Sequence, residues 1–159
     1  MRVFFAVVVA VAGASLSPVR FPLQSGWYSG TAAAHACPGV AAARCSEAWS
    51  WAATVRWKDC SDCLPHSTIA SLPSSGLAIQ VSLIRERPVT AKSALIWPPH
   101  VAAADVGGLE GLSNRIGVYQ RFARVGEFEV QIFVFFGRSR PTASQLVAAN
   151  KELHATRLP

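Results

Sequence analysis

The sequence predicts an α+β fold, in which an antiparallel sheet of four to six strands carries a C-terminal helix packed on one face. Alternating apolar and polar residues mark strands at 49–58 and 77–86. Two further strands, 116–124 and 127–136, flank the two-residue connection Val125-Gly126 and form a hairpin. A capping box that starts at Thr142, followed by apolar residues at helical spacing, predicts the C-terminal helix.

The N-terminus has the three parts of a secretory signal. Arg2 precedes an uninterrupted apolar run (4–12), and small residues follow it. An A-x-A cleavage site lies at the end of this run. The run is too short to cross a membrane, which takes about 20 residues. We therefore expect residues 1–14 to be a signal peptide and the mature protein to be extracytoplasmic, either secreted or in the cell envelope. The alternative is a buried first strand at 3–12.

The next segment, 15–25, contains two prolines and three serines. Such a composition is typical of loops, so we expect an extended leader that is not part of the core. The single α+β domain then spans 26–159, with its first strand within 26–34.

Four cysteines survive removal of the predicted signal: Cys37, Cys45, Cys60 and Cys63. An even number in an exported chain predicts two disulfides. All three connectivities remain open. The local pairing joins Cys37 to Cys45 and Cys60 to Cys63, whereas a crossed pairing closes longer loops.

A second hypothesis for these residues is a thiol-disulfide or metal-dependent activity at Cys60, Cys63 and His66. A redox C-x-x-C normally begins a long helix that lowers the pKa of its first thiol, but Pro65 follows here after two residues. Zinc ribbons use closely spaced cysteine pairs, and the other pair here is separated by seven residues. We therefore rank this hypothesis second and expect neither a bound metal nor a cofactor.

Three tryptophans, Trp49, Trp51 and Trp57, share one face of the strand predicted at 49–58. One interpretation is an aromatic surface that binds a ligand. The favoured interpretation is a sheet face packed beneath a helix, because large aromatic residues on an alternating strand usually fill the core.

The C-terminal half contains a long irregular segment, 87–115, with three prolines and three glycines. Connections of this length are uncommon and usually carry function or local order. The strand 127–136 is polar near the turn and apolar on both faces at its end, which predicts an interior strand. The final helix begins with a capping box, Thr142 to Gln145. Its spacing predicts that one side faces the sheet, formed by Ala143, Leu146, Val147, Asn150 and Leu153.

The net charge is +6, and 12 of the 15 basic residues are arginine. The arginines around the hairpin fall at opposite ends of its strands, and the chain has no basic run. Nucleic acid is therefore not an expected partner, and an anionic surface or another envelope component is the candidate. The sequence contains no G-x-S-x-G, H-E-x-x-H or phosphate-loop pattern, so a non-enzymatic protein is favoured.

Several of these features together resemble a known kind of protein. They are the Gly26-Trp27 opening, the turn and strand from Leu72-Pro73 to Gly76-Leu77, the hairpin and the capped last helix. Their order resembles uncharacterised exported actinobacterial domains and is similar to PsbP-like α+β domains, in which helices cover an antiparallel sheet. The resemblance implies a fold and no catalytic residues. We expect an exported non-enzymatic binding or envelope-associated domain, with the segment 87–115 and the cysteine segment at its surface.

Overall fold

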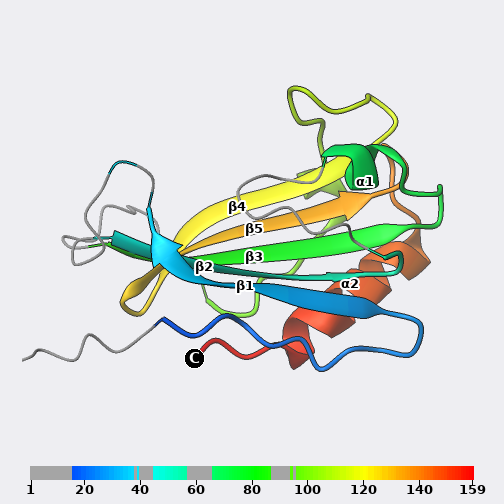
Figure 1. The fold of residues 1–159 in the computed structure, drawn as a ribbon. Helices are drawn as coiled ribbons and strands as arrows, with labels where there is room; N and C mark the ends of the chain where they lie inside the picture. The colour runs from blue at the N-terminus through cyan, green and yellow to red at the C-terminus, as the bar shows by residue number, and fades with distance from the viewer. Residues whose placement is uncertain (1–15, 38, 40–44, 57–65, 87–93, 95) are drawn as a thin grey trace, which may run out of the picture.

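The computed structural model describes residues 16–37, 39, 45–56, 66–86, 94 and 96–159. Five strands form one antiparallel sheet in the order β1-β2-β3-β5-β4 (Figure 1), and the helix α2 (Ala143–Ala155) crosses one face of it. The predicted α+β class is therefore confirmed. A short helix, α1 (His66–Ala70), and a 3-10 turn, η1 (Ala103–Asp105), complete the described elements. The strands are β1 (Tyr28–Ala36), β2 (Cys45–Ala53), β3 (Leu77–Glu86), β4 (Gly117–Val125) and β5 (Phe128–Phe136).

β3 has the predicted limits, whereas boundaries of the other strands differ from the sequence prediction, most of all in β2, which begins at Cys45 and not at Trp49. β2 ends at Ala53, because the backbone of Leu77 donates to the Thr54 hydroxyl (3.0 Å) and accepts from the Thr54 amide (2.9 Å), which replaces strand pairing by a local contact. The turn of the β4–β5 hairpin lies one residue later than predicted, at Gly126 and Glu127. Gly126 has φ +59°, and it occupies the first central position of the turn, where a type II′ turn requires glycine.

The sheet separates two groups of buried side chains. On the α2 face, Ile79, Ile132 and Val134 pack with Leu153 of the helix. On the opposite face, Trp51, Phe133 and Phe135 pack with Ile69 of α1 and with its neighbour Leu72. β5 pairs with a strand on both sides and is buried on both faces at its end, which confirms the predicted interior strand.

The N-terminal strap (residues 16–24) corrects the expectation of a leader outside the core. Leu16, Val19 and Phe21 are buried with the side chains of the α2 face. The strap also runs beside the C-terminal tail (Figure 1), where Arg20 bridges to Arg157. Its prolines prevent regular structure without preventing burial, since an extended chain can direct alternate side chains into the core. The predicted signal peptide, 1–14, lies outside the described residues.

The capping box of α2 is confirmed, but its buried side matches the prediction only in part: Leu153 is buried and Leu146 packs on the core as predicted, whereas Ala143 is exposed. The Thr142 hydroxyl accepts from the Gln145 amide (3.2 Å), and the Gln145 side chain accepts from the Thr142 amide (3.0 Å). Val147, expected to be buried, is 67% exposed. The side that faces inward includes two polar residues, Gln145 and Glu152, with Ala149 and Leu153. Apolar spacing does not find such a side, because Gln145 and Glu152 Oε2 meet hydrogen-bond partners that are distant in sequence, while Glu152 Oε1 is buried without one among the described residues.

Those contacts join α2 to the rest of the fold. Gln145 Nε2 donates to the carbonyls of Ser74 (3.2 Å) and Gly76 (3.0 Å) in the turn before β3. Glu152 Oε2 accepts from the backbone amide (3.3 Å) and the side chain (3.1 Å) of Gln24 in the N-terminal strap. The helix is therefore held at both ends by buried polar contacts as well as by apolar packing.

Candidate functional site

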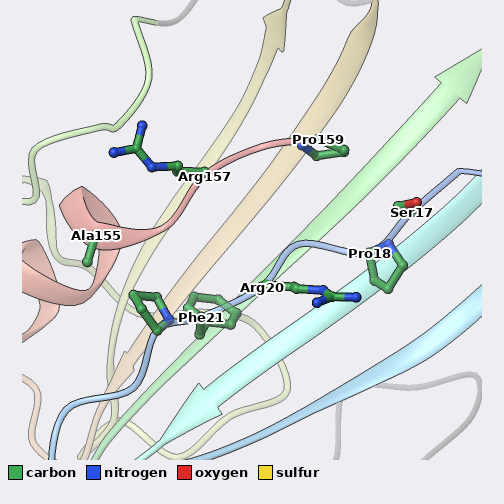
Figure 2. A pocket seen from close by; sticks show the side chains of 8 residues that line it. Ser17, Pro18, Arg20, Phe21, Ala155, Arg157 and Pro159 are labelled. Atoms are coloured by element: carbon green, nitrogen blue, oxygen red, sulfur yellow. The ribbon is translucent and has the colours of Figure 1, made fainter.

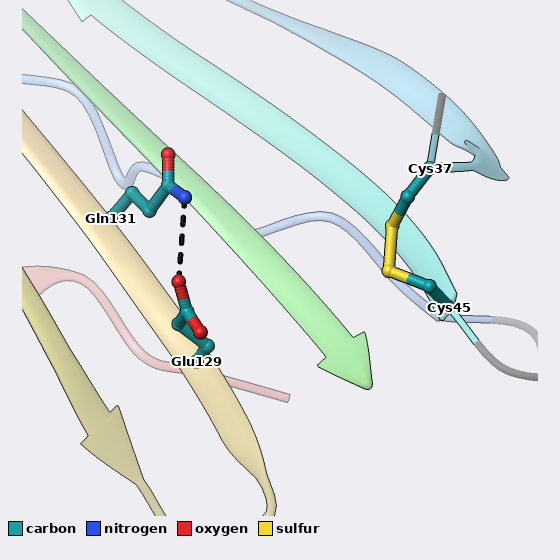
Figure 3. The surroundings of a disulfide bond; sticks show 4 residues. All are labelled: Cys37, Cys45, Glu129 and Gln131. Atoms are coloured by element: carbon teal, nitrogen blue, oxygen red, sulfur yellow. Dashed lines mark hydrogen bonds between the residues drawn. A yellow bond between two sulfur atoms is a disulfide. The ribbon is translucent and has the colours of Figure 1, made fainter. Parts of the chain in front are cut away.

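One of the predicted disulfides is present. Cys37 and Cys45 are bonded, with their Cα atoms 5.5 Å apart, and they join the end of β1 to the first residue of β2 (Figure 3). This is the local pairing of the alternatives. Cys60 and Cys63 lie outside the described residues, so their pairing stays a prediction.

The same limit applies to the proposed thiol or metal chemistry. His66 begins α1, but its side chain is not among those described. In the part of the chain that the structure describes, no group of three or more His, Cys, Asp or Glu side chains could hold a metal ion. The hypothesis of an activity at Cys60, Cys63 and His66 therefore remains a prediction.

The tryptophans on β2 do not form an exposed platform. Trp49 is 8% exposed and Trp51 is 6% exposed, and both belong to the buried group beneath α1. Trp51 also packs closely over β1, because a Cβ on Gly30 would lie 2.6 Å from its indole ring. Trp57 lies outside the described residues. For the two that are described, the favoured core interpretation is correct.

Two polar residues near the turn end of β5, Glu129 and Gln131, lie in the part of the sheet that Figure 3 shows together with the disulfide. Gln131 Nε2 donates to Glu129 Oε1 (3.5 Å), as Figure 3 shows, and both side chains are half-buried. Glu129 and Gln131 are two of the polar residues predicted near the hairpin turn. This long contact joins the two side chains to each other, and neither of them lines the two surface hollows described below.

A surface hollow of about 650 Å³ lies between the N-terminal strap and the C-terminal tail. Its two charged residues are Arg20 and Arg157, but Figure 2 shows their side chains pointing away from each other. Most of the other lining is apolar or proline. The two guanidinium groups therefore do not converge on one ligand. The lining residues are Ser17, Pro18, Arg20, Phe21, Pro22, Ala155, Arg157 and Pro159.

A second hollow, of about 540 Å³, lies along the outer edge of β4. The segment after Ala94 touches this edge at two points: Ala94 bridges to Arg124, and Gly107 bridges to Val118. Between these points the segment leaves the strand, and the hollow occupies the space. We call it the loop–strand cleft. Its lining residues are Ala94, Ile96, Pro98, Pro99, His100, Asp105, Tyr119, Gln120 and Arg121.

The loop wall of the cleft is anchored to α2. Asn150 accepts from the Val101 amide (2.8 Å) and donates to the Val101 carbonyl (3.0 Å), so it pairs with this backbone as another strand would. The indole N–H of Trp97 donates to the Thr156 carbonyl at the end of the helix (3.0 Å). Asp105 accepts from the Ala102 amide (3.2 Å) and stabilises η1. The wall is therefore built before any ligand arrives.

The strand wall of the cleft contributes backbone groups. The amide and the carbonyl of Val118 both bond to Gly107, at 2.8 and 2.9 Å, so they point away from β5. In a strand, residues two positions apart direct their backbone groups to the same side. The N–H and C=O of Gln120 therefore point from the edge of β4 toward the cleft, and no backbone partner meets them there among the described residues.

Tyr119 lines the cleft and is buried against the core of the α2 face, and two charged residues of the cleft act on it. Burial raises the pKa of Tyr119, Arg121 lowers it by a smaller amount, and Asp105 adds a further rise. The hydroxyl group therefore stays protonated at neutral pH and can donate a hydrogen bond. Asp105 and Arg121 do not form an ion pair with each other, since the ion pair among the described residues is Arg85–Glu127 (3.4 Å). Each of the two acts separately on the pKa of Tyr119.

Sequence reasoning did not find this site. Asp105 is 14 residues from Tyr119 in the chain, and neither belongs to a motif. The one signal was the length of the irregular segment 87–115, which favoured a functional connection.

No helix among the described residues is long and apolar enough to cross a membrane. Comparison of the chain with protein-family models, with curated proteins and with solved structures finds no match.

Proposed function

We propose that this protein is an exported, non-enzymatic binding domain that holds a small polar ligand in the loop–strand cleft. The observation that carries the proposal is the construction of the cleft from two elements. Its loop wall is fixed to α2 by Asn150, and its strand wall offers the outward backbone groups of Gln120. Preformed hollows with a few convergent polar groups are the usual form of ligand sites.

The chemistry of the cleft favours binding over catalysis. Tyr119 has a raised pKa, so it is a hydrogen-bond donor rather than a base near neutral pH. None of the hydrogen bonds among the described residues joins it to His100 or to Asp105, and a nucleophile would need such a partner. The cleft therefore supports recognition of a polar molecule.

Export is the other half of the proposal, and three observations support it. They are the signal-like sequence at 1–14, the Cys37–Cys45 disulfide and the resemblance to exported actinobacterial domains. The burial of Leu16 adds a constraint, because cleavage must leave this side chain attached to the domain. An envelope component or an anionic surface remains the proposed setting.

Export is tested by expressing the full chain in a bacterium that secretes proteins and measuring the intact mass of the product. We expect a mature chain that begins between residues 13 and 16 and lacks at least the two hydrogens of the Cys37–Cys45 thiols, or four if Cys60 and Cys63 are also bonded. A cytoplasmic product with Met1 still attached would contradict this half of the proposal.

Binding is tested by titrating isotope-labelled mature protein with a library of small polar compounds and following the backbone amide signals. We expect at least one compound to shift the amides of Gln120 and Arg121 at a concentration of about 1 mM or lower. Arg20 and Arg157, in the other hollow, serve as internal controls. If no compound moves the cleft amides, the proposed binding function is wrong.

A further inference from the structure

We infer that the ligand of the loop–strand cleft is a short peptide of two or three residues with free termini, which lies along the open edge of β4. This inference rests on the proposed function and names its substrate class. Three independent features of the cleft point to such a molecule: its separated charges, its open backbone edge and its apolar rim.

The charges select a ligand that carries both signs. Asp105 and Arg121 line the same cleft and are not within ion-pair distance of each other. A ligand with only negative charge is attracted by Arg121 but repelled by Asp105, and a cation meets the opposite situation. A zwitterion can place its carboxylate at Arg121 and its ammonium group at Asp105, so both interactions are favourable.

The open edge of β4 selects a peptide among zwitterions. The outward N–H and C=O of Gln120 present one donor and one acceptor in the geometry of a strand ladder. A peptide bond supplies the complementary acceptor and donor, as in strand addition to a sheet edge. A free amino acid has no peptide bond and cannot complete this pair.

The dimensions of the cleft set the length of the peptide. The strand residues that line it are Tyr119, Gln120 and Arg121. At a rise of about 3.4 Å per residue, three strand residues extend over about 10 Å, which matches two or three residues of an extended peptide. The segment closes against β4 at Gly107–Val118 and at Ala94–Arg124, so a longer strand would collide with it.

The rim of the cleft favours apolar side chains on the peptide. Ile96 is 89% exposed, and Pro98 and Pro99 lie beside it in the lining. An isolated exposed isoleucine is ordinary on a protein surface. Here it borders a hollow with polar groups at its base, so a peptide side chain would cover it.

The probe for this inference is the dipeptide alanyl-leucine, compared with its N-acetylated and its C-amidated forms. Binding is measured from amide shifts and by calorimetry. We expect the free dipeptide to shift the amides of Gln120 and Arg121, and each capped form to bind about tenfold or more weakly, because each lacks one charge.

Charge variants of the protein assign the two ends of the peptide. Arg121→Gln should weaken the free and N-acetylated forms but have no further effect on the amidated form. Asp105→Asn, which keeps an acceptor for the Ala102 amide, should weaken the free and amidated forms only. The matched controls are Arg138→Gln and Glu110→Gln, exposed residues that do not line the cleft.

Gln120→Pro tests the backbone contact. This substitution removes an N–H that points away from β5, and proline is accepted in an edge strand at such a position. We expect it to weaken dipeptide binding about tenfold, whereas Gln120→Ala should not. A dipeptide with a methylated peptide nitrogen tests the same pairing from the ligand side, and does not depend on how the proline variant folds.

The possible failures are distinguishable. If the capped dipeptides bind as well as the free one, or if the charge variants behave as their controls, the peptide inference is wrong. The proposed function then still stands when another compound of the library shifts the cleft amides. If no compound shifts them, both are wrong.

Discussion

Asn150→Ala is the substitution that best tests how the fold builds the cleft. Asn150 lies on α2 and does not line the cleft. Its side chain makes both hydrogen bonds to the backbone of Val101, at 2.8 and 3.0 Å. The substitution removes both bonds and leaves the apolar contacts of the helix in place.

The magnitude follows from the burial of Val101, which is 1% exposed. A buried backbone group that loses its partner costs about 1–3 kcal/mol, so two groups cost about 2–6 kcal/mol if the loop stays in place, and the loss falls toward the lower end when the loop shifts and water reaches them. Alanine favours the helix over asparagine by about 0.6 kcal/mol. We therefore expect the free energy of unfolding to fall by about 2–3 kcal/mol, a large part of a typical total of about 5–15 kcal/mol.

The assay is urea unfolding of the mature protein, combined with hydrogen exchange at the Val101 amide. Lys151→Ala, an exposed neighbour on the same helix, is the matched control and should change the free energy of unfolding by less than about 0.5 kcal/mol. Exchange at Val101 should become faster in the Asn150 variant alone. An unchanged exchange rate, or a loss below about 0.5 kcal/mol, would refute the idea that Asn150 anchors the loop.

Three further predictions concern other parts of the fold. Gly137→Ala should destabilise the protein by more than about 2 kcal/mol in chemical unfolding, because a Cβ there would collide with the backbone oxygen of Pro73 in the turn before β3. Gly108→Ala, whose Cβ would meet nothing within 4 Å, should be close to neutral. Burial raises the pKa of Tyr119 above 10.0, so the unfolded state loses this proton first. This group should therefore leave the free energy of unfolding unchanged below pH 10.0 and lower it as the pH rises above 10.0. Tyr119→Phe should make the free energy of unfolding fall less steeply with pH in that range. An equally steep fall in both proteins would contradict the assignment. Replacing both Cys37 and Cys45 by serine opens a link between residues 8 apart and should lower the free energy of unfolding by about 2–3 kcal/mol, whereas an unchanged urea midpoint would show that the disulfide adds no stability.

The strands were predictable where alternation and turn chemistry agreed. β3 has the predicted limits because Leu77, Ile79, Val81 and Leu83 alternate between the turn at Pro73 and the end of the apolar pattern. The predicted end of β2 is too late. Alternation continues past Ala53 in the sequence, whereas in the structure Thr54 bonds to Leu77 and ends the strand pairing. A contact between residues 23 apart therefore overrode a local pattern.

The candidate site was less predictable than the fold. The favoured interpretation of Trp49 and Trp51 as core residues is correct, because large aromatic residues on an alternating strand usually fill the core. The cleft residues are ordinary by type, and their significance comes from position. Asp105 and Arg121 are brought together only because Asn150 holds the loop and Gly107 pairs with β4.

The sequence by itself determined the α+β class, the hairpin, the capped helix and the even set of cysteines, because these depend on periodicity, turn residues and caps within a few positions. The tertiary structure decided which side of α2 faces inward, the burial of the N-terminal strap and the location of the cleft. Each of these depends on polar contacts between distant segments, such as Gln24 with Glu152 and Val101 with Asn150. Such contacts provide hydrogen-bond partners for buried polar groups and do not depend on apolar periodicity, so no pattern along the chain predicts them.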